Sequence, residues 1–276
     1  MKYFIIAVVA TVLGLASYGQ AVLPAAHQTH QYVPLLKGKR VAVFANQTSQ
    51  INSTHLVDSL QKLGITITKI FGPEHGFRGT ADAGEKVGNY FDKETGIPVI
   101  SLYGKKRKIA AADVLDVDVI VFDIQDVGVR FYTYISSLQE LMESAVELEK
   151  EVVILDRPNP NGHYVDGPVL DTVFKSFIGM QPVPVVYGLT IGEYAHLLAG
   201  EGWLSVSGSN KYRRKSAQEF TIGKANFTIV KNQQYTHSTA YSLPVKPSPN
   251  LPDDWSITLY PSTCFFEGTV LSEGRG

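Results

Sequence analysis

The sequence of 276 residues lacks the features that mark several large classes of protein. A single cysteine, Cys264, excludes an internal disulfide and any zinc or iron–sulfur site that needs several cysteines. The 25 basic and 26 acidic residues give a formal net charge of −1, so no general attraction to nucleic acid or to an anionic membrane is expected. These absences argue against an obligate nucleic-acid-binding protein.

Short motifs of cofactor and nucleophile chemistry are also absent. The glycines of a dinucleotide fingerprint do not follow the first predicted strand, which argues against NAD. The run 84–88 lacks the Gly-Lys-Ser/Thr ending of a phosphate loop, and there is no Gly-x-Ser-x-Gly sequence. Some side chains could bind a metal ion, although no diagnostic spacing such as His-x-x-x-His supports this: His75, Asp123, Asp126 and His163. We therefore expect neither a cofactor nor a metal.

The N-terminal residues have the layout of a secretory signal peptide. Lys2 precedes an apolar run over 4–16, and small and polar residues follow through Ala21. The run is short for a bilayer, and no later segment is long and apolar enough to cross one. We expect 1–21 to be removed and the mature protein to be exported, to the periplasm or beyond, without stable membrane insertion. The glycine-rich turn 272–276 looks like a cut through a longer protein.

Short apolar runs alternate with amphipathic segments between residues 40 and 155. Continuous hydrophobicity, typical of strands buried on both faces, predicts strands at 40–45, 65–71, 98–102, 117–124 and 152–155. Apolar residues at helical spacing predict helices at 54–63, with Ser53 as its N-cap, and at 131–150. This alternation predicts an α/β fold with a mainly parallel sheet and flanking helices.

Proline and glycine become dense after Pro158, and the alternation weakens. A helix is expected at 191–198 and a strand at 227–230. We divide the chain into a loop-like leader at 22–38, an α/β domain at 39–190, and the start of a smaller C-terminal domain at 191–276. The later part could also return to complete the first domain.

Polar side chains follow four of the predicted strands, where ligands bind in open parallel sheets. Asp, Asn, Pro and Gly also form turns for local reasons, but four such runs at one edge favour a polar cleft. Asn46 follows the strand at 40–45, and Glu74, His75 and Arg78 follow the strand at 65–71. Asp123, Gln125, Asp126, Arg130 and Tyr132 lie at or after the end of the strand at 117–124. Asp156, Arg157 and Asn159 follow the strand at 152–155.

Glu74 and His75 are the sharpest pair at this edge. Surrounding glycines and a proline fix the backbone around two groups that can transfer protons; the alternative is a tight loop with a surface glutamate. Glu267 lies between aromatic residues and glycine. If its loop folds over the sheet edge, apolar neighbours would raise its pKa toward the range of a general acid.

Two further features leave alternatives open. Asp123 and Asp126 could act as acid and base, hold a metal, or bind hydroxyl groups. A pair of carboxylates could also cleave a glycosidic bond. The one dense basic run, 104–108, is either a solvated loop or attracts an anionic substrate.

Several longer runs resemble a single family. The runs are FGPEHGFRG at 71–79, FDIQDVGVRFYTY at 122–134, LDRPNP at 155–160, KPSPNL at 246–251 and FEGT at 266–269. Over about 35–276, the chain resembles the exo-β-N-acetylmuramidases, long catalogued as a domain of unknown function. The resemblance implies a glycoside hydrolase that removes N-acetylmuramic acid from the non-reducing end of peptidoglycan fragments. It also implies a Rossmann-like N-terminal domain, a smaller C-terminal domain and a cleft between them.

The resemblance also implies roles for individual residues. Glu74 is the first catalytic candidate and Glu267 the second. The substrate-binding candidates are Asn46, His75, Arg78, Asp123, Gln125, Asp126, Arg130, Tyr132, Asp156, Arg157, Asn159 and Asn250. Muramic acid carries a lactyl carboxylate, which Arg78, Arg130 or Arg157 could hold by bidentate hydrogen bonds. Tyr132 or Phe77 could stack on a sugar face. Family members continue beyond the position of Gly276.

Two other functions stay open at this point. An exported protein that binds sugars or muropeptides would use the same cleft without chemistry, and a metal-dependent hydrolase or deacetylase would use its histidines and aspartates. In each case the expected partners are peptidoglycan-derived saccharides. Retention or inversion of the anomeric configuration also stays open, because it depends on the separation of the two carboxylates.

Overall fold

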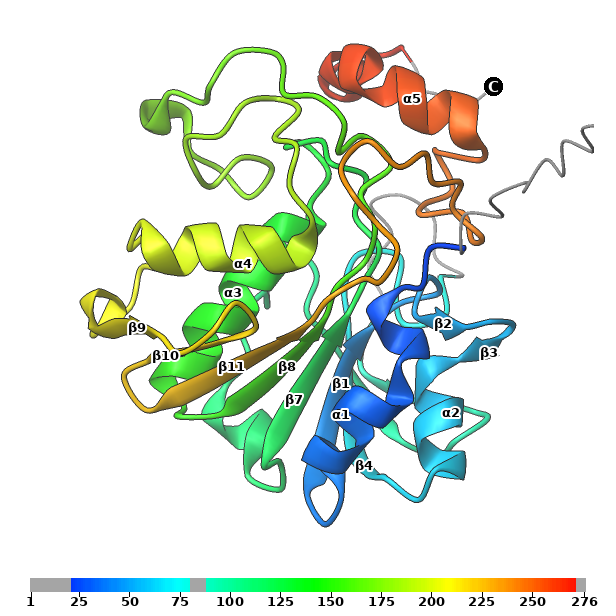
Figure 1. Ribbon diagram of the computed structural model, residues 1–276, viewed down its shortest axis with the longest axis vertical. Helices are drawn as coiled ribbons and strands as arrows, with labels where there is room; N and C mark the ends of the chain where they lie inside the picture. The colour runs from blue at the N-terminus through cyan, green and yellow to red at the C-terminus, as the bar shows by residue number, and fades with distance from the viewer. Residues whose placement is uncertain (1–20, 80–87, 272–276) are drawn as a thin grey trace, which may run out of the picture.

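A nine-stranded sheet forms the centre of the protein (Figure 1). The structure, a computed structural model, describes residues 21–79 and 88–271, so the predicted signal peptide, most of the run 84–88 and the turn 272–276 lie outside it. The strand order is β5-β6-β4-β1-β7-β8-β11-β10-β9. Pairing is parallel from β6 to β11 and antiparallel at both edges. The strands are β1 (Arg40–Ala45), β4 (Thr66–Gly72), β5 (Tyr90–Phe91), β6 (Pro98–Ser101), β7 (Val119–Asp123), β8 (Glu151–Leu155), β9 (Tyr212–Arg214), β10 (Glu219–Ile222) and β11 (Ala225–Val230).

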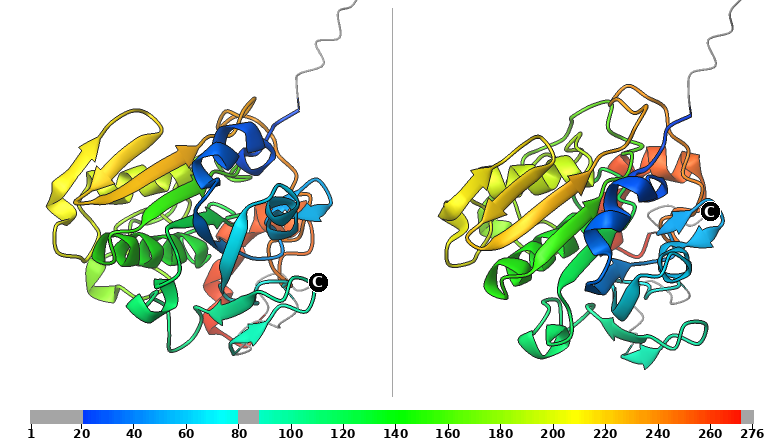
Figure 2. Two further views of the ribbon diagram at one scale, coloured as in Figure 1. Left: turned by 90° about the horizontal axis from the view of Figure 1, so that it is seen from below. Right: turned by 60° about the horizontal axis from the view of Figure 1, so that its bottom comes forward.

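Helices cover both faces of the sheet (Figures 1 and 2). On one face α1 (Thr29–Leu36) and α2 (Leu56–Lys62) pack in a cluster with alternate side chains of β1. On the other face α3 (Tyr134–Glu147) and α4 (Ile191–Gly200) pack with the side chains of the opposite parity. This two-sided burial explains the continuous hydrophobicity of the central strands. No helix in the described ranges is long and apolar enough to span a membrane.

The remaining elements are short and lie mainly at the ends of the sheet. A separate pair of strands joins β2 (Gln50–Ile51) to β3 (Thr54–His55). The 3₁₀ helices are η1 (Ala25–His27), η2 (Ala111–Val114), η3 (Thr172–Phe174), η4 (Ser209–Lys211) and η5 (Cys264–Gly268). Helix α5 (Asp254–Thr263) precedes η5 and lies beyond the carboxyl ends of the central strands (Figure 1). The carboxyl edge of the sheet is therefore covered by the last part of the described chain.

The predicted α/β sheet is confirmed, and two of the expected local elements are wrong. The segment 22–38 is not a loop: it contains η1 and α1, and Tyr32 and Leu36 of α1 are fully buried. The helix predicted at 54–63 is α2, which begins at Leu56, after β3. Its N-cap is His55, whose Nδ1 accepts a hydrogen bond from the Val57 amide at 3.2 Å. Ser53 does not cap it.

The sheet continues beyond residue 190, where the sequence suggested a new domain. Strand β11 pairs in parallel with β8, so that Thr228 lies opposite Val153, and β10 and β9 extend the sheet to its edge. The α/β layer is thus completed by residues 212–230, as the alternative interpretation allowed. A separate, smaller C-terminal domain stays a prediction.

Candidate active site

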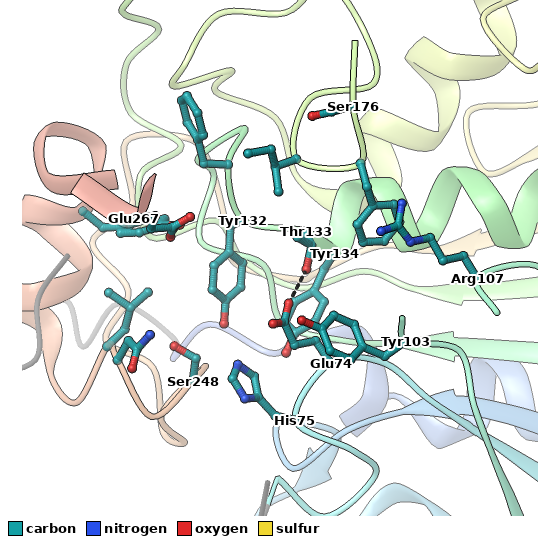
Figure 3. Close-up of a pocket in the computed structure, with 16 residues that line it drawn as sticks. Glu74, His75, Tyr103, Arg107, Tyr132, Thr133, Tyr134, Ser176, Ser248 and Glu267 are labelled. Carbon is teal, nitrogen blue, oxygen red and sulfur yellow. Dashed lines mark hydrogen bonds between the residues drawn. The ribbon is translucent and has the colours of Figure 1, made fainter. Parts of the chain in front are cut away.

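A cavity of about 810 Å³ lies at the carboxyl edge of the sheet, and we call it the Glu74 cavity (Figure 3). Its walls come from the loop after β4, the segment between β7 and α3, the segment 176–178, and the last part of the chain from 248 onward. Five of the predicted site residues line it: Glu74, His75, Tyr132, Asn250 and Glu267. Segments that are almost two hundred positions apart in the sequence therefore meet in one site.

Glu74 enters the cavity because the chain turns sharply after β4. A Cβ atom at Gly72 would lie 3.2 Å from the Phe77 amide nitrogen, so glycine is needed for this close approach. His75, also in the cavity wall, has a φ of 66°, which is in the left-handed region that non-glycine residues rarely occupy. The Thr133 hydroxyl donates a hydrogen bond to Glu74 Oε2 at 3.4 Å. The loop geometry thus presents a carboxylate and an imidazole together.

The Glu74 carboxylate lies beside a tyrosine that the sequence did not single out. Burial, and secondarily the neighbouring Glu74 carboxylate, raises the pKa of Tyr103 to about 12. The two side chains lie together at the same wall in Figure 3. Tyr103 therefore keeps its proton at neutral pH and can serve Glu74 or a ligand as a donor.

Glu267 reaches the same cavity from η5. The Tyr260 hydroxyl of α5 donates a short hydrogen bond to Glu267 Oε1, and burial together with this carboxylate raises the pKa of Tyr260. Figure 3 shows Glu267 and Glu74 at different walls, with the ring of Tyr132 between them. Glu267 is exposed, so the enclosure by aromatic neighbours suggested by the sequence is absent. Two carboxylates nevertheless face one cavity.

Tyrosine rings form the back of the cavity. Tyr132 packs edge-to-face against Tyr134, with centroids 4.9 Å apart, and against Tyr260 at 5.9 Å. Asn46 Nδ2 donates to the Tyr134 hydroxyl at 2.9 Å, so Asn46 lies behind the wall and not in it. Aromatic rings and hydroxyl groups beside carboxylates are suited to a polar ligand with apolar faces, such as a sugar.

The three arginines expected to hold a substrate carboxylate do not line the cavity. Arg157 makes a bidentate pair with Asp123, at 2.6 and 2.8 Å, and both side chains are almost fully buried. Arg78 makes a second bidentate pair with Asp92, at 2.9 and 2.8 Å. Arg130 donates to backbone carbonyl oxygens. These guanidinium groups bind the loops to one another, which corrects the role suggested for them and for Asp123.

Other predicted cleft residues also serve the backbone. Gln125 Nε2 donates to two carbonyl oxygens, at 2.8 and 2.7 Å, and Asn159 Nδ2 donates to a third at 2.9 Å. Asp156 accepts from the amide of Gly192 at 2.8 Å, near the start of α4, and lines a second cavity of about 840 Å³. Phe77 is fully buried and presents no face to a ligand. These residues therefore lie outside the Glu74 cavity.

Asp126 is also outside the cavity, and its burial predicts a pH effect on stability. Burial raises its pKa to about 7, although the Tyr187 hydroxyl and the Gly128 amide donate to its Oδ1. The folded state therefore holds the proton more tightly than the unfolded state, and stability from this group falls as the pH rises from about 4 to about 7.

Asp126→Asn keeps an acceptor for both donors and cannot ionise. We expect the free energy of unfolding of the variant, relative to that of the wild type, to increase by about 2 kcal/mol from pH 5 to pH 8. Urea unfolding of both proteins at the two pH values measures this gain. An equal difference in the free energy of unfolding at both pH values would contradict the prediction.

The described part of the chain contains no group of three or more His, Cys, Asp or Glu side chains arranged to bind a metal ion. Asp123 pairs with Arg157, and Asp126 is bound by Tyr187. The metal ligands considered from the sequence are thus not brought together.

Sequence reasoning missed several residues of the cavity. Arg107 belongs to the basic run 104–108 and was not separated from its lysine neighbours, and Phe177 lies in a stretch without any motif. Thr133, Tyr134 and Ser248 lie inside the runs that carry the family resemblance, which was the only signal for them.

Comparisons with known proteins identify the family of the chain. Residues 41–255 match the family model described as "Exo-beta-N-acetylmuramidase NamZ, N-terminal". The peptidoglycan beta-N-acetylmuramidase NamZ of Bacillus subtilis (strain 168) is 42% identical over 254 residues, which cover 89% of this chain. The chain spans only 56% of the length of that relative.

Two crystal structures of DUF1343 family proteins from Bacteroides fragilis share the fold. One is 43% identical to this chain and superposes with a TM-score of 0.76; the match covers 90% of this chain and 62% of the Bacteroides chain. The other is 32% identical with a TM-score of 0.74, covering 89% and 60%. The motifs, the fold and the family match agree, and the chain belongs to the exo-beta-N-acetylmuramidase NamZ family through its N-terminal region.

Proposed function

We propose that the protein is an exo-acting β-N-acetylmuramidase, which releases N-acetylmuramic acid from the non-reducing end of peptidoglycan fragments. The observation that carries the proposal is the meeting of Glu74 and Glu267 in one cavity lined with tyrosines. The relative from Bacillus subtilis, named as a peptidoglycan beta-N-acetylmuramidase, supports the substrate class. Because the chain spans little more than half of that relative, the activity of the whole protein is part of the proposal.

In most glycosidases, two carboxyl groups flank the scissile bond. The protonated group gives its proton to the glycosidic oxygen as the C1–O bond breaks, and the carboxylate stabilises the positive charge that develops on the sugar. The carboxylate then either takes a proton from the attacking water, or bonds to C1. In the second case, water that gives its proton to the first carboxyl group breaks the new bond and releases the sugar. Glu74 and Glu267 fill these two positions, and the ring of Tyr132 lies between them.

Export of the protein is a second part of the proposal. The N-terminal sequence has a basic residue, an apolar run and a small-residue region in the order of a signal peptide. Peptidoglycan itself lies outside the cytoplasmic membrane, so export would bring the protein to the source of its substrate. The mass of the mature protein recovered from cells would reveal cleavage near Ala21.

A tetrasaccharide that alternates N-acetylmuramic acid and N-acetylglucosamine, with the former at the non-reducing end, tests the reaction. We expect mass spectrometry to show free N-acetylmuramic acid and a trisaccharide, with the same yield in the presence of EDTA. Disaccharide products would show endo-cleavage, and loss of activity in EDTA would favour a metal-dependent hydrolase. Saturable binding without any product would support the sugar-binding alternative and contradict the enzyme.

A further inference from the structure

We propose that Arg107 is the residue by which the Glu74 cavity selects a sugar that carries a carboxylate. In terms of substrate, Arg107 would distinguish N-acetylmuramic acid from N-acetylglucosamine, since the two differ by the lactyl ether and its carboxylate. The inference rests on the proposed function and adds the residue that binds the negatively charged group of the substrate.

The charged residues of the cavity would disfavour an anionic substrate if no cation were present among them. Among the described residues that line it, Glu74 and Glu267 carry carboxylates, and Arg107 alone carries a permanent positive charge. A further carboxylate entering on a substrate would be repelled by the glutamate that stays ionised. A cation in the wall offsets this repulsion only for ligands that bring a negative charge, which makes Arg107 a selective feature.

The two lysines on either side of Arg107 are already engaged in ion pairs. Lys106 pairs with Asp113 at 2.7 Å, and Lys108 pairs with Glu143 at 2.7 Å. Among the described residues, none forms an ion pair with Arg107. Two of the three lysines of the basic run are therefore held in ion pairs, whereas Arg107 lines the Glu74 cavity.

The guanidinium of Arg107 is held in a geometry suited to a carboxylate. Its Cζ lies 4.1 Å from the centroid of the Phe177 ring, so one face of the planar group is stacked on an aromatic ring. Stacking on one face leaves the N–H groups at the edge to donate in parallel to two carboxylate oxygens. In Figure 3 Arg107 lies on the Glu74 side of the cavity, away from Glu267. A lactyl carboxylate bound there would fix which way the sugar faces the two glutamates.

The test compares two 4-nitrophenyl β-glycosides, one of N-acetylmuramic acid and one of N-acetylglucosamine. We expect Arg107→Gln to lower the ratio of their kcat/KM values by about 10- to 100-fold, the range for loss of a charge-assisted hydrogen-bonded pair. Arg107→Lys should give an intermediate ratio, because lysine supplies the charge without the planar fork. Lys105→Gln, in the same run but outside the cavity, is the matched control and should keep the wild-type ratio.

Calorimetric titration with the two free sugars gives a readout that does not depend on turnover. The ratio of their dissociation constants should shift in the same direction in Arg107→Gln. If the wild type cleaves neither glycoside, the proposed function fails, while the binding ratio still decides the role of Arg107. A wild-type protein that binds both sugars equally would overturn the inference. So would an Arg107→Gln variant that keeps the wild-type binding ratio, or a Lys105→Gln variant that loses it.

Discussion

Glu74→Gln should lower the rate of N-acetylmuramic acid release by about 10³-fold, within the usual range for loss of a proton-transferring group. The amide has nearly the same shape as the carboxyl group and can still accept the hydrogen bond that Thr133 donates. It can neither give nor take the proton that bond cleavage requires. The expected loss is therefore in kcat, with the melting temperature and the affinity for sugar almost unchanged. Initial rates at saturating tetrasaccharide, together with a thermal melt, measure both.

Two further variants sharpen this experiment. Glu201→Gln, on an exposed residue at the end of α4, is the matched control and should keep the wild-type rate. If Glu74 and Glu267 act in one step, the double variant with both glutamines should be little slower than the slower single variant. Unchanged turnover in Glu74→Gln would remove this residue from the mechanism.

Arg157→Met should lower the free energy of unfolding by about 3 to 5 kcal/mol, because it leaves the Asp123 carboxylate buried without its partner. Both side chains are almost completely shielded from solvent, and the pair is bidentate. It joins the ends of β7 and β8, the strands that lead to the site. Urea unfolding at neutral pH measures the change.

The double variant Arg157→Met/Asp123→Asn separates loss of the pair from loss of one partner. Removing the unpaired charge should recover part of the stability, so the double variant should unfold at a higher urea concentration than Arg157→Met. If the single variant is insoluble, a larger soluble yield of the double variant gives the same comparison. Arg40→Met, which breaks an exposed pair with Asp118, should have little effect. An equal loss in Arg40→Met and Arg157→Met would contradict the argument from burial.

The central strands could be predicted because burial on both faces leaves a simple pattern. The run from Arg40 to Ala45 needs no partner to be recognised as a strand. Helix α1 gave no such signal: it is one short helix with Pro34 inside it, and polar residues at 29–31 precede its buried Tyr32. The edge strand β9 and its neighbour β10 are short, so their assignment depends on the pairing of β9 with β10 and of β10 with β11. Elements defined by partners rather than by their own periodicity were missed.

The same limit applies to the site. Glycine and proline around Glu74 marked a loop with a special path, and the loop does enter the cavity. An arginine in a binding site and an arginine in a buried ion pair look alike in a sequence. Arg157 was therefore expected in the cleft because its neighbours were polar, although it pairs with Asp123. The sequence indicates that the basic run 104–108 could attract an anionic substrate, but it does not separate Arg107 from its lysine neighbours, which only the geometry does.

The backbone of His75 has a consequence for attempts to engineer this protein. A left-handed conformation costs a residue with a side chain roughly 1 kcal/mol or more, and glycine adopts it without that cost. Glycine at this position would relieve the backbone, but it would also remove a buried side chain and the imidazole of the cavity wall. A screen by melting temperature responds only to the net change in stability, whereas a screen for sugar release also responds to loss of the imidazole. The choice of screen, more than the size of the library, decides which protein emerges.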